Sequence, residues 1–155
     1  MTYRITGLSP EPFRALFAMS DEALAERRAV RVVADSKPGF PCRITLADAE
    51  QGEPLILVHH VSHDVATPYR SAYAIYIRDT EAAPPSYVDE VPPCFAGRAL
   101  SLRAFGADEM VRRAVLAAAG EADDTIRDLF ADPGVATIQA HFAAYGCFAA
   151  RIERQ

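Results

Sequence analysis

The chain has no tryptophan and no long run of apolar residues among its 155 positions. A membrane-spanning helix needs about 18 or more consecutive apolar residues, and no segment comes near that length. The first residues, MTYRITGLSPEPF, also lack the basic start and apolar stretch of a secretory signal peptide. We therefore expect a cytoplasmic protein without a membrane partner.

Cysteine is scarce as well, and the three cysteines are Cys42, Cys94 and Cys147. An odd number of widely spaced cysteines is a poor disulfide framework, and thiols stay reduced in a cytoplasm. No two of them are close enough in the sequence for a zinc knuckle or ribbon. We expect three free thiols and no structural zinc.

Clusters of positive charge are missing too. The formal net charge is −5, and the basic residues are scattered apart from the pairs Arg27-Arg28 and Arg112-Arg113. Nucleic-acid-binding proteins usually carry a clustered basic surface, so we expect no nucleic-acid partner. The sequence has no GxGxxG, GxxxxGKS/T or GxSxG motif. Nucleotide-binding loops and a hydrolase nucleophile elbow therefore have no support, and we expect no cofactor.

What is present is an ordinary globular composition, with 50% hydrophobic and 24% charged residues. The length suits one domain, residues 1–155, with a core of its own. Apolar patterns predict strands at residues 2–6, 29–35, 54–61, 69–79 and 98–106. Capping and turn signals predict helices at residues 9–19, 20–28 and 121–134. Residues 111–119 fit either a strand or a helix, and the proline-rich segment 81–97 is expected to be a surface connection.

The last part of the chain is predicted to be a β-hairpin, with arms at 135–142 and 147–152 around the turn AAYG. Strands outnumber helices and do not alternate regularly with them. This pattern favours an α+β fold. We expect a single domain with a mainly antiparallel sheet, short N-terminal helices and one helix before the C-terminal hairpin.

The hairpin allows one prediction about which side chains share a face. The apolar positions of both arms are even-numbered: Ile138, Ala140, Phe142, Phe148, Ala150 and Ile152. Burying them together places the odd-numbered positions together on the other face. His141 and Cys147 should then be neighbours roughly 5–8 Å apart, and the imidazole could activate the thiol as a nucleophile. The alternative is a solvated face with an inert cysteine.

Three histidines near the end of one predicted strand, His59, His60 and His63, raise the question of a metal site. Neighbouring residues of a strand point to opposite faces, which separates His59 from His60. The helical HExxH pattern is absent. We therefore expect no metal here, and histidines at the solvent boundary of a strand end.

Two further pairs are candidates for chemistry. Cys42 precedes Arg43 after a proline-bounded turn, and a neighbouring guanidinium would favour a thiolate. The alternative is a small buried thiol beside a surface arginine. Tyr69 and Arg70 could supply a hydroxyl and a guanidinium to a carboxylate or phosphate, since arginine binds such groups bidentately. The alternative is an ordinary strand start.

Three blocks of the sequence together resemble a bacterial family of uncharacterised proteins, domain-of-unknown-function family 1203. The blocks are Gly39-Phe40-Pro41-Cys42-Arg43, Pro68-Tyr69-Arg70 and Gly146-Cys147-Phe148. The resemblance runs over nearly the whole chain and implies a single-domain soluble protein. It indicates no particular activity, cofactor or substrate. It also favours a strand at 111–119. Relatives often carry a second histidine and an asparagine where this chain has Gln139 and Phe142, so a metal or catalytic pair built on those groups would be missing here.

The function itself stays unknown at this stage, and the best hypothesis is a domain that binds a small polar or anionic ligand. We expect a cleft between residues 40–43, the Tyr69-Arg70 pair and the odd face of the hairpin, with Arg43, Arg70 or Arg151 holding the ligand. One alternative is a thiol enzyme with Cys147 or Cys42 as nucleophile and His141 as base. Another is an interaction protein that pairs an exposed edge strand with a partner or with a second copy, as a homodimer.

Overall fold

The computed structural model describes residues 1–155 as two antiparallel sheets and four short helices. The large sheet has the strand order β5-β1-β9-β8-β6-β7. Its strands, in chain order, are β1 (Tyr3–Thr6), β5 (Ser86–Val88), β6 (Leu100–Phe105), β7 (Val111–Ala117), β8 (Thr137–Phe142) and β9 (Phe148–Arg154). The small sheet has the order β2-β3-β4, with β2 (Ala29–Val33), β3 (Pro54–His63) and β4 (Ser71–Ile77).

Two helices precede the small sheet and two belong to the large one. The first pair is a 3-10 helix, η1 (Glu11–Ala18), and α1 (Asp21–Glu26), and the second pair is η2 (Pro93–Phe95) and α2 (Ala122–Phe130). Ser20 caps α1 as expected, since its hydroxyl accepts a hydrogen bond from the amide of Ala23 at 3.3 Å. The predicted α+β class, with a mainly antiparallel sheet and a helix before the C-terminal hairpin, is confirmed.

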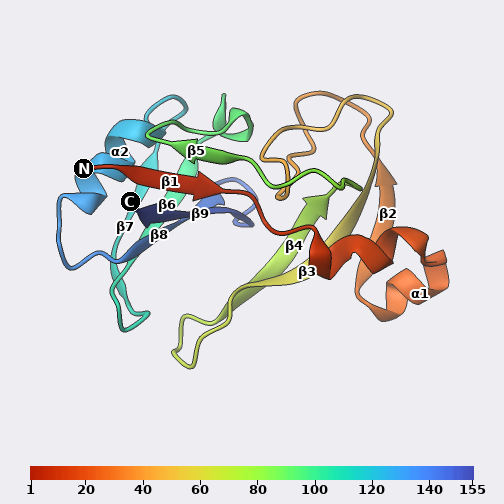
Figure 1. Cartoon of the computed structure of the whole chain (residues 1–155), viewed down its shortest axis with the longest axis horizontal. Helices are drawn as coiled ribbons and strands as arrows, with labels where there is room; N and C mark the ends of the chain where they lie inside the picture. The colour runs from red at the N-terminus through yellow and green to blue at the C-terminus, as the bar shows by residue number, and fades with distance from the viewer.

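The path of the chain explains how the two sheets come to lie side by side (Figure 1). The chain starts in the large sheet with β1, builds the whole small sheet, and returns to the large sheet at β5. It leaves β1 at Gly7, where a Cβ atom would lie only 2.0 Å from the carbonyl oxygen of Ile44. Glycine alone permits this approach. The next amide, that of Leu8, donates to the carbonyl oxygen of Arg43 at 2.9 Å and fixes the segment around Arg43 against the crossing.

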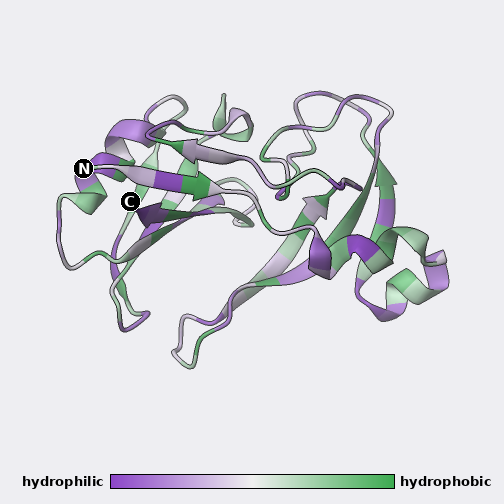
Figure 2. Cartoon of the chain, viewed as in Figure 1, coloured by the Kyte–Doolittle hydropathy of each residue, from purple (hydrophilic) through white to green (hydrophobic).

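Each sheet has its own hydrophobic core. The larger core lies between the large sheet and α2, which contributes Ile126, Leu129 and Phe130. The smaller core lies between the small sheet and the helices η1 and α1. Figure 2 shows hydrophobic residues along the strands of the small sheet, as expected for strands covered by helices. The two cores are separate clusters, so the space between the two sheets is not filled by either of them and can hold a cavity.

Two expectations about single segments are settled by the structure. Residues 111–117 of the ambiguous segment form a strand, β7 (Val111–Ala117), as the family resemblance favoured. Segment 81–97 is more than a surface connection, because it contains β5, which pairs with β1, and η2. The side chains of Cys94 and Phe95 in η2 are 1% and 3% exposed and belong to the larger core. Their burial outweighs the turn-forming tendency of the flanking prolines.

The C-terminal hairpin forms as predicted, but some of its side chains lie on a different face of the sheet from the one predicted. Ile138 pairs with Ile152 and Ala140 with Ala150, so these even positions share a face. The register then shifts, and His141 pairs with Phe148. This is a β-bulge at Ala149, and it reverses the faces of the residues before it.

The prediction that His141 and Cys147 share a face is therefore wrong. Cys147 instead lies opposite Phe142, whose amide donates to the Cys147 carbonyl oxygen at 3.0 Å, and both side chains belong to the larger core cluster. The odd face is also not solvated, because Gln139 and His141 are 1% and 3% exposed. The small sheet covers this face, since His63 of β3 contacts Gln139 of β8.

Candidate functional site

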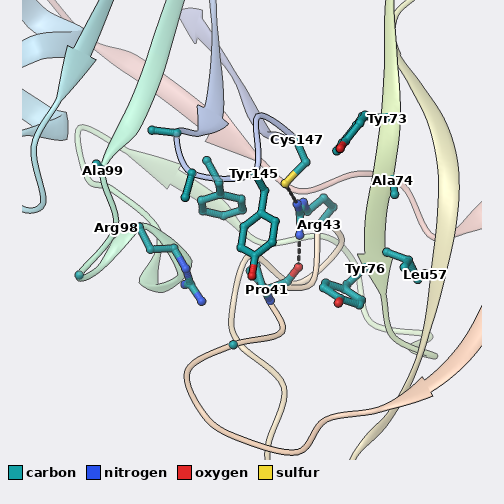
Figure 3. Close-up of a pocket in the computed structure, with 15 residues that line it drawn as sticks. Pro41, Arg43, Leu57, Tyr73, Ala74, Tyr76, Arg98, Ala99, Tyr145 and Cys147 are labelled. Carbon is teal, nitrogen blue, oxygen red and sulfur yellow. Dashed lines mark hydrogen bonds between the residues drawn. The ribbon is translucent and has the colours of Figure 1, made fainter.

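A pocket of about 470 Å³ lies between the two sheets and is the larger of two cavities in the structure. Four parts of the chain line it: the turn at 39–43, strands β3 and β4, the segment 97–99 before β6, and the β8–β9 turn at 142–147. Figure 3 shows that side chains from these segments, far apart in the sequence, face one another across the pocket. Ten of the fifteen lining residues are hydrophobic, so the few polar groups stand out.

Arg43 is the most buried of these polar groups, with 2% of its surface exposed. Its Nε donates to the carbonyl oxygen of Phe148 at 2.7 Å, and its Nη1 donates to the carbonyl oxygen of Pro41. Its Nη2 donates to the sulfur of Cys147 at 3.0 Å. These contacts tie the 39–43 turn to the start of β9 and hold the guanidinium at the pocket wall (Figure 3).

The charge of Arg43 has no carboxylate partner, since every ion pair of the structure involves other residues. Burial accordingly lowers the pKa of Arg43. The guanidinium lies over the ring of Phe142, with its central carbon 4.8 Å from the ring centroid, a favourable cation–π distance. A ring face and two carbonyl oxygens offset part of the cost of burying a charge, but they do not neutralise it.

A second arginine of the pocket, Arg98, is fully paired. Its Nη1 and Nη2 donate to the two carboxylate oxygens of Asp48 at 2.8 and 2.6 Å. Its central carbon also lies 5.3 Å from the Phe142 ring centroid. Burial raises the pKa of Asp48, but the hydrogen bonds from Arg98 and from the Gly39 amide outweigh burial and leave this pKa below its usual range. The pocket wall therefore holds two cations, Arg43 and Arg98, and the carboxylate of Asp48 pairs with the second of them.

Three tyrosines provide the aromatic part of the wall. Tyr73 and Tyr76 come from β4, and Tyr145 comes from the β8–β9 turn. Figure 3 shows Tyr145 and Tyr73 on opposite sides of Arg43. Tyr73 is 57% exposed and Tyr145 is 80% exposed, so both rings are free to contact a molecule that enters the pocket. Burial raises the pKa of Tyr76, which therefore stays a neutral phenol.

The three cysteines are free and differ in access. Cys147 lines the pocket and is 8% exposed. Cys42 is fully buried in the smaller core. Cys94 is 1% exposed, and burial raises the pKa of its thiol to about 12. Cys147 is thus the cysteine that a molecule in the pocket can touch.

Of the residues predicted for a site, the structure brings Arg43 and Cys147 together and places the others elsewhere. Tyr69 and Arg70 lie at the tip of the β3–β4 hairpin, where the Arg70 Nε donates to an Asp64 carboxylate oxygen at 2.8 Å. Arg151 lies on β9 and donates to Glu153 at 2.9 Å. The side chains of Tyr69, Arg70 and Arg151 do not line the pocket.

The histidines have structural neighbours. Both ring nitrogens of His141 have partners other than Cys147, namely the carbonyl oxygen of Gly146 and the amide of Gln139. His60 lies between two aromatic rings, and burial lowers its pKa. His63 is 3% exposed and not at the solvent boundary. No group of three or more His, Cys, Asp or Glu side chains is arranged to hold a metal ion.

Sequence reasoning missed Arg98, Asp48 and Tyr145. Arg98 and Asp48 are 50 positions apart, and no motif marks either of them. Tyr145 lies in a four-residue turn, and an aromatic residue in such a turn was the one sequence feature that could have indicated a binding role. Their roles follow from the meeting of two sheets, which no local pattern encodes.

The fold and the site define an α+β protein with a pocket between two antiparallel sheets. A family model described as "Protein of unknown function (DUF1203)" matches residues 39–154, and the chain belongs to this family. The match covers all four segments that line the pocket. Neither the curated proteins nor the solved structures contain a match. None of the helices has the length and hydrophobicity that crossing a membrane would require.

Proposed function

We propose that the pocket binds a small molecule that combines a flat apolar body with one anionic group. The observation that carries this proposal is the Arg43 guanidinium, a buried cation without a carboxylate partner at the wall of a pocket. An isolated buried charge is costly, and an anion in the pocket would relieve that cost.

Arg43 has hydrogen-bond donors left for such an anion. A guanidinium has five N–H groups, and three of them bond to Phe148, Pro41 and Cys147. One N–H group on Nη1 and one on Nη2 therefore remain without a partner. These two N–H groups can donate to a carboxylate, a group that arginine commonly binds.

The apolar body of the ligand would contact the aromatic wall. Tyr73 and Tyr145 are the large exposed rings of the pocket, and rings bury large apolar areas at low entropic cost. A volume of about 470 Å³ falls in the range of small-molecule sites. An aromatic carboxylate therefore fits better than a small inorganic anion.

A second candidate function is thiol chemistry at Cys147, and the 3.0 Å contact between its sulfur and Arg43 favours it. A Cys147 thiolate would itself be the missing counter-ion of the guanidinium. In this case Arg43 stabilises the thiolate. His141 has no place as the base, since its ring nitrogens bond elsewhere, and Cys42 has no access to the pocket.

The test is a calorimetric and thermal-shift comparison of benzoate, benzamide, acetate and phosphate. We expect benzoate to bind and to raise the melting temperature, and its neutral amide analogue to have no effect. Tyr145→Ala and Tyr73→Ala should weaken benzoate binding while leaving the melting temperature of the free protein nearly unchanged, because both rings are exposed. Tyr69→Ala, outside the pocket, is the control.

Equal binding of benzoate and benzamide would remove the role of the anionic group. Unaltered benzoate binding in Tyr145→Ala and Tyr73→Ala would place the ligand elsewhere. For the thiol alternative, Cys147 should react with iodoacetamide below pH 8 in the free protein, and phosphate or benzoate should slow this reaction by competing for Arg43.

A further inference from the structure

The free edge of one strand lines the pocket. In the small sheet the order β2-β3-β4 leaves β4 with a neighbouring strand on one side only, and Tyr73, Ala74 and Tyr76 of β4 are lining residues. The remaining edge strands, β2, β5 and β7, contribute no residue to the pocket. Figure 3 shows the β4 residues on one side of the pocket, next to Arg43. Because an unpaired strand edge can accept a further strand, β4 is a candidate for binding an extended chain.

The hydrogen-bond pattern shows which backbone groups of β4 point away from β3. In an antiparallel pair, residues whose N–H and C=O groups point to the partner strand alternate with residues whose groups point away. Ala74 lies opposite His59, whose amide donates to the carbonyl oxygen of Arg28, next to β2, at 3.1 Å. Ala74 and His59 are therefore not hydrogen-bonded to each other, and the N–H and C=O of Ala74 point to the open edge.

The protein itself extends the small sheet along part of this edge. Tyr76, two positions after Ala74, presents its backbone groups to the same side. Its carbonyl oxygen accepts a hydrogen bond from the Arg43 amide at 3.0 Å, and Tyr76 forms a parallel bridge with Cys42. Residues 41–43 therefore act as a short added strand. No equivalent segment pairs with Ala74, whose N–H and C=O are left for a molecule in the pocket.

We propose that the pocket binds the C-terminal end of an extended peptide, which adds to β4 as a further strand. This inference rests on the function proposed above and names the class of the ligand. The anionic group is the terminal carboxylate, and the flat apolar body is the aromatic side chain of the last residue. The peptide backbone offers an N–H and a carbonyl to Ala74, and such main-chain hydrogen bonds supply affinity when a peptide adds to a sheet edge.

Arg43 decides which end of a peptide enters the pocket. Residues 41–43 already occupy the edge beside Tyr76, so a strand beside Ala74 ends against them. The Arg43 guanidinium is a buried cation at the pocket wall without a carboxylate partner. It attracts a terminal carboxylate and repels a terminal ammonium. The exposed tyrosine rings of the pocket are then available to the side chain of the last residue.

Calorimetry on the whole protein separates the contribution of the peptide groups from that of the ring and the carboxylate. N-acetyl-alanyl-phenylalanine and 3-phenylpropanoate carry the same ring and carboxylate, but only the first has peptide groups. We expect the peptide to bind at least about tenfold more tightly, because two added hydrogen bonds contribute that much. Its C-terminal amide form, without the negative charge, should not bind. The analogue methylated on both backbone nitrogens should bind no more tightly than 3-phenylpropanoate.

A proline on β4 tests the place of binding. Ala74→Pro removes the outward N–H, so it should abolish the preference for the peptide and keep the affinity for 3-phenylpropanoate. Proline is tolerated on an edge strand where the N–H points outward. Ala72→Pro is the matched control, because Ala72, opposite Val61, has the same outward orientation but does not line the pocket. This variant should keep the preference for the peptide.

Equal affinities of the peptide and 3-phenylpropanoate in the unmodified protein would overturn this inference and leave the proposed function standing. If neither molecule binds, the proposed function fails as well. A preference for the peptide that survives in Ala74→Pro would remove the β4 edge from the site, and the methylated peptide makes the same test if this variant does not fold. A dimer of the free protein that is lost in Ala74→Pro, seen by light scattering, would assign the edge to a second copy of the chain instead.

Discussion

Arg43 and Cys147 are 104 positions apart, and the guanidinium of the first donates to the sulfur of the second at 3.0 Å. This contact joins the connection between β2 and β3 of the small sheet to the turn between β8 and β9 of the large one. The same guanidinium holds the carbonyl oxygens of Pro41 and Phe148. Arg43 is therefore both the proposed ligand anchor and a structural connection between two distant parts of the chain.

Replacing Arg43 by lysine should reduce stability. The three acceptors of Arg43 are each reached by a different nitrogen of the guanidinium. An ammonium has all its N–H groups on one atom and cannot span these three positions, so at least one buried acceptor loses its donor. We expect Arg43→Lys to lower the free energy of unfolding by about 2–4 kcal/mol, measured by denaturant titration. The matched control is Arg14→Lys, at an exposed pair with Glu11, where the change should stay below about 0.5 kcal/mol. A similar small loss in both variants would contradict a structural role for Arg43.

The cysteines should react with iodoacetamide in a fixed order. Cys147 is accessible from the pocket, Cys42 is fully buried, and the pKa of Cys94 is raised to about 12 by burial. In the native protein at pH 8 we expect mass spectrometry to find the label on Cys147 first. Cys147→Ser should remain unlabelled over the same time and take up two labels once unfolded in denaturant. Early labelling of Cys94 would show that the larger core opens more readily than its packing indicates.

A single methyl group at position 7 should disturb the crossing between the sheets. In Gly7→Ala the new Cβ would lie 2.0 Å from the Ile44 carbonyl oxygen, and neither backbone can move without breaking the hydrogen bond from Leu8 to Arg43. We expect a loss of at least about 2 kcal/mol, seen as a lower melting temperature. Gly134→Ala is the control, because its nearest neighbour is the flexible end of Asp132 at 3.1 Å. Equal melting temperatures for the two variants would refute the close approach.

Acid should destabilise the fold partly through His141. Burial lowers the pKa of His141 to about 4, whereas the unfolded chain has the ordinary value of about 6.5. The unfolded state therefore binds a proton that the folded state does not, so stability falls as the pH drops from 6.5 to 4 and is unaffected by this group above 6.5. The loss amounts to about 3 kcal/mol at pH 4.

His141→Asn should remove this part of the acid dependence, measured by denaturant titration at pH 7, 6, 5 and 4. His59 is exposed on β3 and supplies the control, since His59→Asn should keep the full acid dependence. If both variants follow the unmodified protein down to pH 4, the imidazole of His141 is protonated in the fold as easily as in the unfolded chain.

Much of the fold could be predicted from the sequence because the signals are local. The Ser20 cap, the apolar stripe of α2 and the alternating hairpin arms each report on their own segment. The prediction of which hairpin side chains share a face was wrong because of one residue, Ala149. Ala149 is small and apolar and fits either face, so nothing in its identity reveals that it forms a bulge.

The site could be predicted only in part, for a related reason. Arg43 and Cys147 were identified from their surroundings in the sequence, and the structure brings them into contact. Tyr69 and Arg70 were grouped with them, yet they lie at a hairpin tip. Which segments meet depends on how the small sheet rests against the large one, and that arrangement is set by contacts such as the one at Gly7.

The division of the interior into two cores implies that the molecule need not unfold as one cooperative unit. A cluster of ten buried residues supports the small sheet, against 21 for the large one. Amides of β2–β4 should therefore exchange with deuterium through a lower-energy opening than those of β8 and β9. A molecule held in the pocket would contact both sheets at once. The amides of the small sheet should then exchange with deuterium as slowly as those of the large sheet.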